Sequence, residues 1–122
     1  VFIAGNGGSA ATASHMANDL MLGVAKAGGQ GFRAIALTDG IPTITAIAND
    51  EGYDNIFASQ LSVLGQPGDL LVLISGSGNS PNVLRAAEVA REKGMEAIGF
   101  LGKGGGKLAG MVDIPVTVPS NE

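Results

Sequence analysis

Two short glycine- and serine-rich segments carry the residues best suited to binding an anion. They are residues 5–9 (GNGGS) and residues 75–80 (SGSGNS). Each follows a short aliphatic run and precedes a stretch with helical spacing, so each should lie at a helix N-terminus, where unpaired N–H groups and the helix dipole attract negative charge. Glycines let the backbone approach a ligand closely, and serine hydroxyls donate hydrogen bonds. The two segments therefore predict a site for a phosphate group.

The first segment alone also permits two other interpretations. It fits a plain tight turn, and Gly5, Gly7 and Ala10 satisfy the dinucleotide fingerprint G-x-G-x-x-G/A, with Asp39 placed after a later strand as a candidate ribose ligand. However, Asp39 lies farther on than the usual spacing of about 20 residues. A dinucleotide-binding fold also has no need for the serine-rich residues 75–80. We therefore favour a phosphate held between two loops, with no nucleotide cofactor.

A third glycine-rich segment, residues 102–107 (GKGGGK), does not match the P-loop pattern. Leu101 stands where the first glycine belongs, and Leu108 follows Lys107 in place of serine or threonine. This segment gives no prediction of function.

His15 and Asp19 are separated by four residues within a stretch of helical spacing. That separation places both side chains on one helical face, opposite a stripe of apolar residues, so they can reach a reactant or a metal ion together. The stripe consists of Ala13, Met16, Ala17 and Leu20. The alternative is an exposed polar face with an ordinary helical side-chain pair.

The composition narrows the class of protein. A chain of 122 residues fits one domain, and 45% hydrophobic residues with only 15% charged residues are typical of a globular fold. The net charge of −4 argues against direct nucleic-acid binding. The sequence has no cysteine and no apolar run long enough to span a membrane, which favours a cytoplasmic protein without a membrane partner. The chain begins inside a predicted strand, so we expect a fragment of a longer protein.

Short aliphatic runs alternate with helical stretches, which predicts βα units around a parallel sheet. The predicted strands are residues 1–4, 34–37, 70–74, 97–101 and 114–118, and none shows the alternation of a half-exposed strand. We expect all five to be buried on both faces. The fold class is therefore α/β: a three-layer, doubly wound sandwich with a mainly parallel five-stranded sheet, whose ligand lies beyond the carboxyl ends of the strands.

Three helices are predicted. The first covers residues 9–22, with Ser9 as its N-cap. The second covers residues 51–64 and ends at Gly65. The third starts at Ser80-Pro81, a favoured N-cap and first-residue pair, and stops before Gly94.

Four segments of the chain resemble the sugar isomerase (SIS) domain family, in particular its phosphoheptose isomerases and the replication-initiation factor DiaA. They are residues 5–9 with His15 six positions after the serine, residues 45–50 (TAIAND), residues 65–69 (GQPGD) and residues 74–83 (ISGSGNSPNV). The resemblance covers residues 1–122 as one SIS phosphosugar-binding domain. It implies N-terminal helices and a C-terminal helix outside this chain.

The resemblance implies a ligand-binding set and a catalytic set. Phosphate would be held by the second loop, and the sugar by the first loop and an asparagine–aspartate pair. The catalytic set would be His15, Asp19 and Asp50, and His15 and Asp19 would also be metal ligands, of zinc. Asp19 stands where the family has glutamate, and Gly76 where it commonly has threonine. The substrate-binding residues so implied are Asn6, Gly7, Gly8, Ser9, Asn49, Asp50, Ser75, Gly76, Ser77 and Ser80.

The implied activity is the interconversion of a ketose phosphate and an aldose phosphate through an enediolate, as with sedoheptulose 7-phosphate. This chemistry needs a base, an acid and stabilisation of an oxyanion. The implied partner besides the sugar phosphate is a second copy of the chain, in a homotetramer. The alternative is a non-catalytic SIS module that binds a sugar phosphate or acts as a scaffold, as DiaA-like relatives do.

Overall fold

The computed structural model describes residues 1–102 and 104–118 of the chain. Within them, five strands form one parallel sheet in the order β2-β1-β3-β4-β5. This confirms the predicted α/β class and the parallel sheet. The strands are β1 (Phe2–Gly5), β2 (Ile35–Ala36), β3 (Leu70–Ser75), β4 (Glu96–Leu101) and β5 (Ile114–Thr117).

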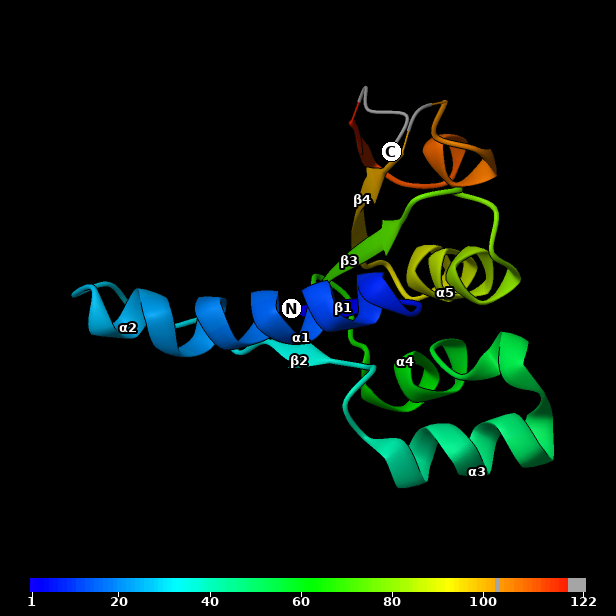
Figure 1. The fold of residues 1–122 in the computed structure, drawn as a ribbon, viewed down its shortest axis with the longest axis horizontal. Helices are drawn as coiled ribbons and strands as arrows, with labels where there is room; N and C mark the ends of the chain where they lie inside the picture. The colour runs from blue at the N-terminus through cyan, green and yellow to red at the C-terminus, as the bar shows by residue number, and fades with distance from the viewer. Residues whose placement is uncertain (103, 119–122) are drawn as a thin grey trace.

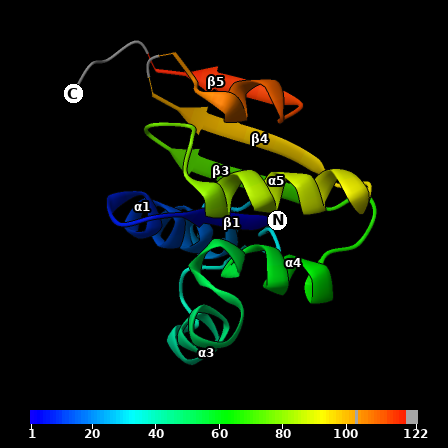
Figure 2. The same ribbon diagram turned by 90° about the vertical axis from the view of Figure 1, so that its right-hand side faces the viewer.

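Helices cover both faces of the sheet, as Figures 1 and 2 show. α1 packs on one face, where Ala13 and Ala17 meet Ile3 and Val72 of the central strands. The helices that follow β2 and β3 pack on the opposite face, against Leu71 and its neighbours. The helical elements are α1 (Gly8–Asn18), η1 (a π-helix, Asp19–Gly23), α2 (Val24–Lys26), α3 (Ile41–Glu51), η2 (Tyr53–Asn55), α4 (Ala58–Leu64), α5 (Pro81–Glu92) and η3 (Lys107–Gly110).

The ends of α5 follow the predicted signals. Ser80 is the N-cap residue and Pro81 the first helical residue, where the missing N–H of proline costs no hydrogen bond. Lys93 is the C-cap, and Gly94 follows with φ +73°, a conformation that favours glycine. The prediction for this helix is confirmed.

The single helix predicted over residues 51–64 is wrong. Glu51 instead ends α3, and Gly52, with φ +98° and ψ 151°, breaks the helix before η2 and α4 begin. The sequence did not predict α3, because its β-branched residues and Pro42 lower helix propensity. Pro42 is tolerated because it lies in the first turn, where its missing N–H costs no helical hydrogen bond. The buried side chain of Ile47 packs the helix against the core.

The expectation that all strands are buried on both faces is also wrong for β5. All four of its residues are exposed, because β5 lies at the edge of the sheet and pairs only with β4. Ile114 and Val116 are the largest side chains left open there. β2, at the other edge, has Ile35 exposed and Ala36 buried. The central strands β1 and β3 carry the buried core.

None of the helices in the described part of the chain is both long and apolar enough to cross a lipid bilayer.

Replacing Leu73 by alanine should lower the free energy of unfolding by about 2–5 kcal/mol, because it removes a fully buried side chain from the central strand. Urea-induced unfolding measures this. The matched control is Val63→Ala, at a side chain that is 83% exposed on α4, for which we expect a change within about 0.5 kcal/mol. Equal effects of the two substitutions would contradict the assigned core.

Candidate functional site

The two glycine- and serine-rich loops meet at one point of the sheet. β1 and β3 are hydrogen-bonded neighbours whose register ends with Gly5 opposite Ile74, so the loops that leave their carboxyl ends start side by side. α1 follows the first loop onto one face and α5 follows the second onto the other. This is the topological switch point where open α/β sheets bind ligands. A cavity of about 170 Å³ lies there, lined by Asn6, Ser9, Ile74, Ser75, Gly76, Ser77 and Ser80.

The first loop turns sharply into α1. Gly7, with φ +55°, is the N-cap residue, and the N–H groups of Ser9 and Ala10 donate to the carbonyls of Asn6 and Gly7. The prediction that Ser9 caps this helix is therefore wrong, because Ser9 lies within its first turn. The Ser9 side chain lines the cavity instead. Among the described residues, the N–H groups of Gly7 and Gly8 have no hydrogen-bond acceptor and remain available for a ligand.

The second loop uses its serine oxygens as acceptors for its own backbone. The N–H of Gly78 donates to Ser75 Oγ at 3.0 Å, and the N–H of Asn79 donates to Ser77 Oγ at 3.1 Å. Each hydroxyl keeps its proton to donate elsewhere. Ser80 is the N-cap of α5, but its side chain makes no capping hydrogen bond. Four hydroxyl groups thus line the cavity with donor capacity to spare, those of Ser9, Ser75, Ser77 and Ser80.

Among residues 1–102 and 104–118, no charged side chain lines this cavity. Within this part of the chain, the groups available to stabilise a bound anion are dipoles and hydrogen-bond donors. α1 and α5 both begin at the cavity, and the positive end of each helix dipole favours negative charge there. This arrangement suits a chain whose net charge is −4.

Backbone hydrogen bonds connect the third glycine-rich segment and the residue after it to the second loop. The N–H of Gly102 donates to the Gly76 carbonyl at 3.1 Å, and the N–H of Leu108 donates to the Gly78 carbonyl at 2.9 Å. Lys107 N–H donates to Asn79 Oδ1 at 2.9 Å. The two backbones approach so closely that side chains do not fit between them: a Cβ on Gly78 would lie 2.1 Å from the carbonyl oxygen of Gly105. The run of glycines was the sequence signal for this contact, although it gave no prediction.

A pair of asparagines joins the first loop to α5. Asn6 Nδ2 donates to Asn82 Oδ1 at 2.8 Å, and Asn82 Nδ2 donates to Asn6 Oδ1 at the same distance. The Tyr53 hydroxyl donates to the same Asn6 oxygen at 3.1 Å. No sequence signal pointed to Tyr53, and Asn82 stood only within the family-like segment 74–83.

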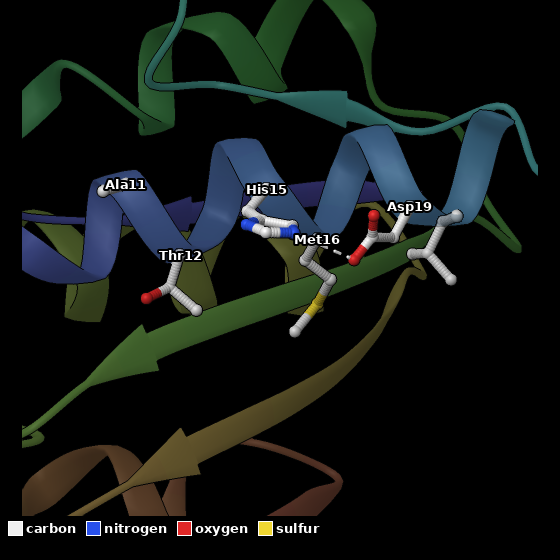
Figure 3. Close-up of a pocket in the computed structure, with 6 residues that line it drawn as sticks. Ala11, Thr12, His15, Met16 and Asp19 are labelled. Carbon is white, nitrogen blue, oxygen red and sulfur yellow. Dashed lines mark ion pairs between the residues drawn. The ribbon is translucent and has the colours of Figure 1, made fainter. Parts of the chain in front are cut away.

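His15 and Asp19 project from the same side of α1 and its π-helical extension, as Figure 3 shows. His15 Nε2 lies 3.2 Å from Asp19 Oδ2, and the two side chains are 75% and 64% exposed. They border an open depression of about 480 Å³ with Thr12 and Met16. This depression shares no lining residue with the cavity between the loops.

The backbone changes form at Asp19. The α-helical hydrogen-bonding pattern ends at Asn18, and residues Asp19–Gly23 form a π-helix in which the N–H of Val24 donates to the Asp19 carbonyl. The predicted continuous α-helix over residues 9–22 is therefore interrupted. Single π-helical turns occur frequently at functional sites, since they re-aim a side chain within a helix.

Two ligands alone do not make a zinc site, since zinc in proteins takes three or four protein ligands. In residues 1–102 and 104–118, no group of three or more histidine, cysteine, aspartate or glutamate side chains is arranged to hold a metal ion. His15 and Asp19 fit two positions of such a site. The other ligands would have to come from outside the described residues.

Asn49 and Asp50 lie exposed near the C-terminal end of α3. Asn49 Nδ2 donates to Asp50 Oδ1 at 3.0 Å. Neither residue lines the cavity between the loops or the depression beside α1. The structure brings the pair together, and the C-terminal end of α3 that carries it leads into η2, where the Tyr53 hydroxyl donates to Asn6 of the first loop.

Asp39, the candidate ribose ligand of the dinucleotide interpretation, has partners within the chain. Its carboxylate accepts hydrogen bonds from the hydroxyls of Ser14 and Thr38. The Thr38 hydroxyl lies equally close to the Ala10 carbonyl of α1, at 3.5 Å, and can donate its one proton there instead. These contacts tie the end of β2 to α1.

A parallel sheet of this order, with a polar cavity at its switch point, defines a doubly wound α/β ligand-binding domain. The sequence model of the SIS domain family matches residues 1–102. The chain therefore belongs to the SIS domain family.

Within that family, the sequence and the fold of this chain are both similar to those of phosphoheptose isomerases. The chain is 49% identical, over all of its 122 residues, to 64% of a phosphoheptose isomerase of Rhodospirillum rubrum. Its fold is similar to that of phosphoheptose isomerase GmhA from Neisseria gonorrhoeae, with a TM-score of 0.88 and 42% identity over 99% of this chain and 64% of that one. A phosphoheptose isomerase from Francisella tularensis gives a TM-score of 0.87 at 38% identity, over 99% of this chain and 63% of that one. The chain thus spans just under two thirds of the length of these relatives.

The close contact behind the second loop gives a direct prediction. Gly78→Ala should lower the free energy of unfolding by about 1–3 kcal/mol, because a Cβ at φ +66° is strained and meets the Gly105 carbonyl. Gly76→Ala, in the same loop, is the matched control, because its Cβ meets nothing within 4 Å and its φ lies outside the left-handed region. Thermal unfolding compares the two. If Gly78→Ala is as stable as Gly76→Ala, the packing described for this loop is incorrect.

Proposed function

We propose that this chain binds a sugar phosphate and that the protein interconverts a ketose phosphate and an aldose phosphate, in the manner of a phosphoheptose isomerase. The observation that carries the proposal is the cavity where the N-termini of α1 and α5 converge on four serine hydroxyls. Similarity to phosphoheptose isomerases supports the choice of substrate class.

The phosphate group would occupy the cavity between the loops. Its oxygens would accept hydrogen bonds from the hydroxyls of Ser75, Ser77 and Ser80. The backbone N–H groups of Gly76 and of the first loop would add further donors. Gly76 lacks the hydroxyl of the threonine common in the family, but its N–H remains, so we expect phosphate binding to be retained.

The sugar would extend from the phosphate along α1. Ser9 lines the phosphate cavity, while Thr12 and His15 border the neighbouring depression on the same helix. Ser9 and His15 are six residues apart, which corresponds to about 9 Å along a helix axis. An extended sugar phosphate of several carbons can bridge that distance. The carbonyl end would then lie beside His15 and Asp19.

The isomerisation moves one proton between adjacent carbons. A base removes the proton from the carbon next to the carbonyl, the C–H electrons form the double bond of an enediolate, and the carbonyl oxygen takes the negative charge. The former carbonyl oxygen gains a proton and the adjacent hydroxyl loses one, and return of the first proton to the former carbonyl carbon then completes the exchange of aldose and ketose. We assign Asp19 as the base and His15 as its partner at the substrate oxygens, with Asp50 as a further catalytic candidate. The 3.2 Å separation of His15 and Asp19 supports their acting as a unit.

A non-catalytic SIS module is the second candidate function. It is favoured by Asp19, whose carboxylate is one methylene shorter than the glutamate of the family, and by Gly76, which lacks the hydroxyl of the family's threonine. Such a module would bind the sugar phosphate in the same cavity without converting it.

We also propose zinc as a metal for which His15 and Asp19 supply two ligands, a homotetrameric assembly and a cytoplasmic location. Support for assembly comes from the apolar side chains exposed on β5 and on η1, among them Leu22 and Ile114. An oligomer would bury such surface. The absence of cysteine suits a reducing compartment.

Ser77→Ala should raise the dissociation constant of the sugar phosphate about 10- to 150-fold. A hydrogen bond to a charged group contributes about 1.5–3 kcal/mol, and each 1.4 kcal/mol corresponds to a factor of ten. Calorimetric titration with sedoheptulose 7-phosphate measures this. Ser62→Ala is the control, because the Ser62 hydroxyl donates to a carbonyl within α4 and does not line the cavity. Unchanged affinity in Ser77→Ala would remove the second loop from the site.

Incubation of the full-length protein with sedoheptulose 7-phosphate should form the aldose phosphate, and Asp19→Asn should reduce kcat by about 100-fold or more, the typical contribution of a general base. Asp19→Glu should remain active. The control is Asp54→Asn, at an exposed carboxylate of η2. If the parent protein binds the ligand but forms no aldose, with or without added zinc, the non-catalytic module is the correct function.

A further inference from the structure

Asn6 and Asn82 form a closed amide pair across 76 positions of sequence. Each side chain donates to and accepts from the other, with both donor–acceptor distances at 2.8 Å. Asn82 is the second residue of α5 and is only 1% exposed. Hydrogen bonds in such a buried setting are stronger than in water, and an amide left there without its partner is costly.

Asn82 and Tyr53 occupy most of the hydrogen-bonding groups of the Asn6 side chain. Its Oδ1 accepts from both Asn82 and the Tyr53 hydroxyl, which fills the two lone pairs of an amide oxygen. Its Nδ2 has given one of two protons to Asn82. At most one side-chain donor of Asn6 is left for a ligand. The Asn6 side chain, which was expected to contact the sugar, therefore mainly connects the first loop to α5.

The Asn6–Asn82 pair connects the two loops that border the phosphate cavity, at a point beyond the end of the sheet. The register of β1 and β3 ends at Gly5 and Ile74, so the ladder does not extend to the two loops. Asn6 follows Gly5 directly, and Asn82 lies two residues after Ser80. Their pair fixes the first loop against the first turn of the helix that the second loop enters. The spacing between the donors of the two loops depends on it.

We propose that Asn82 is a positioning residue, which acts through Asn6 to hold the two loops at the separation that a phosphate group requires. This inference rests on the proposed phosphate cavity. It does not depend on whether the protein isomerises the sugar. Asn82 itself does not line the cavity and acts only through Asn6.

The test compares two substitutions that each replace a buried or half-buried amide by leucine in the full chain. Asn82→Leu keeps the approximate size of the side chain but removes the pair. Gln60→Leu is the matched control, because Gln60 Nε2 donates to the carbonyls of Leu37 and Ile56 away from the cavity. Asn82→Ser, which is too short to reach Asn6, is the second variant if the leucine does not fold.

Two measurements are made on each variant well below its unfolding midpoint. One is the dissociation constant of inorganic phosphate. The other is hydrogen exchange, without ligand, of the Ser9 and Ala10 N–H groups, whose acceptors are the Asn6 and Gly7 carbonyls. Asn82→Leu should weaken phosphate binding about tenfold or more, equivalent to about 1.4 kcal/mol, and should speed exchange at both amides. Gln60→Leu should lower the unfolding midpoint but leave both measurements as in the parent.

A folded Asn82 variant with the phosphate affinity and amide exchange of the parent would overturn the inference. Equal effects of Asn82→Leu and Gln60→Leu on both measurements would also overturn it, because loss of stability alone would then explain them. If the parent chain does not bind phosphate at all, the proposed function fails, and the exchange of Ser9 and Ala10 alone decides whether Asn82 positions the loop.

Discussion

The hydrogen-bonded pairing of β1 with β3 is the constraint on which the rest of the site depends. Because these two strands are parallel neighbours, both of their loops leave at the same edge of the sheet. Because α1 and α5 then pack on opposite faces, their N-termini converge from two sides on one small cavity. If another strand lay between β1 and β3, or if α1 and α5 packed on the same face, the hydrogen-bond donors of the two loops would no longer face each other.

The chemistry of the cavity follows from this convergence. Two helix dipoles, free N–H groups and hydroxyls can stabilise an anion without a basic side chain, and none of the described residues that line the cavity is basic. Such a site would recognise a phosphate group without selecting the rest of the ligand. Any selection, and any reaction, must come from residues farther along α1 and from elsewhere in the protein. His15 and Asp19 lie farther along the same helix whose N-terminus faces the cavity, which is why we propose them for that role.

The sequence predicted the strands and the two loops well, because continuous aliphatic runs and glycine–serine turns are local signals. Its predictions failed where contacts between residues far apart in the sequence determine the local structure. α3 forms against local propensity because Ile47 is buried, and β5 is exposed because nothing in its own residues reveals an edge position. Ser9 was misassigned because Gly7, with positive φ, takes the N-cap position. The Asn6–Asn82 pair joins residues 76 positions apart, which no pattern in a single sequence discloses.

The most direct test of the account is a crystal structure of the chain with bound sedoheptulose 7-phosphate. We predict the phosphate group between the carboxyl ends of β1 and β3, within hydrogen-bonding distance of Ser75, Ser77 and Ser80, with the sugar running along α1 toward His15. A phosphate group bound elsewhere, or a sugar that leads away from α1, would contradict the central claim that the two loops form one phosphosugar site.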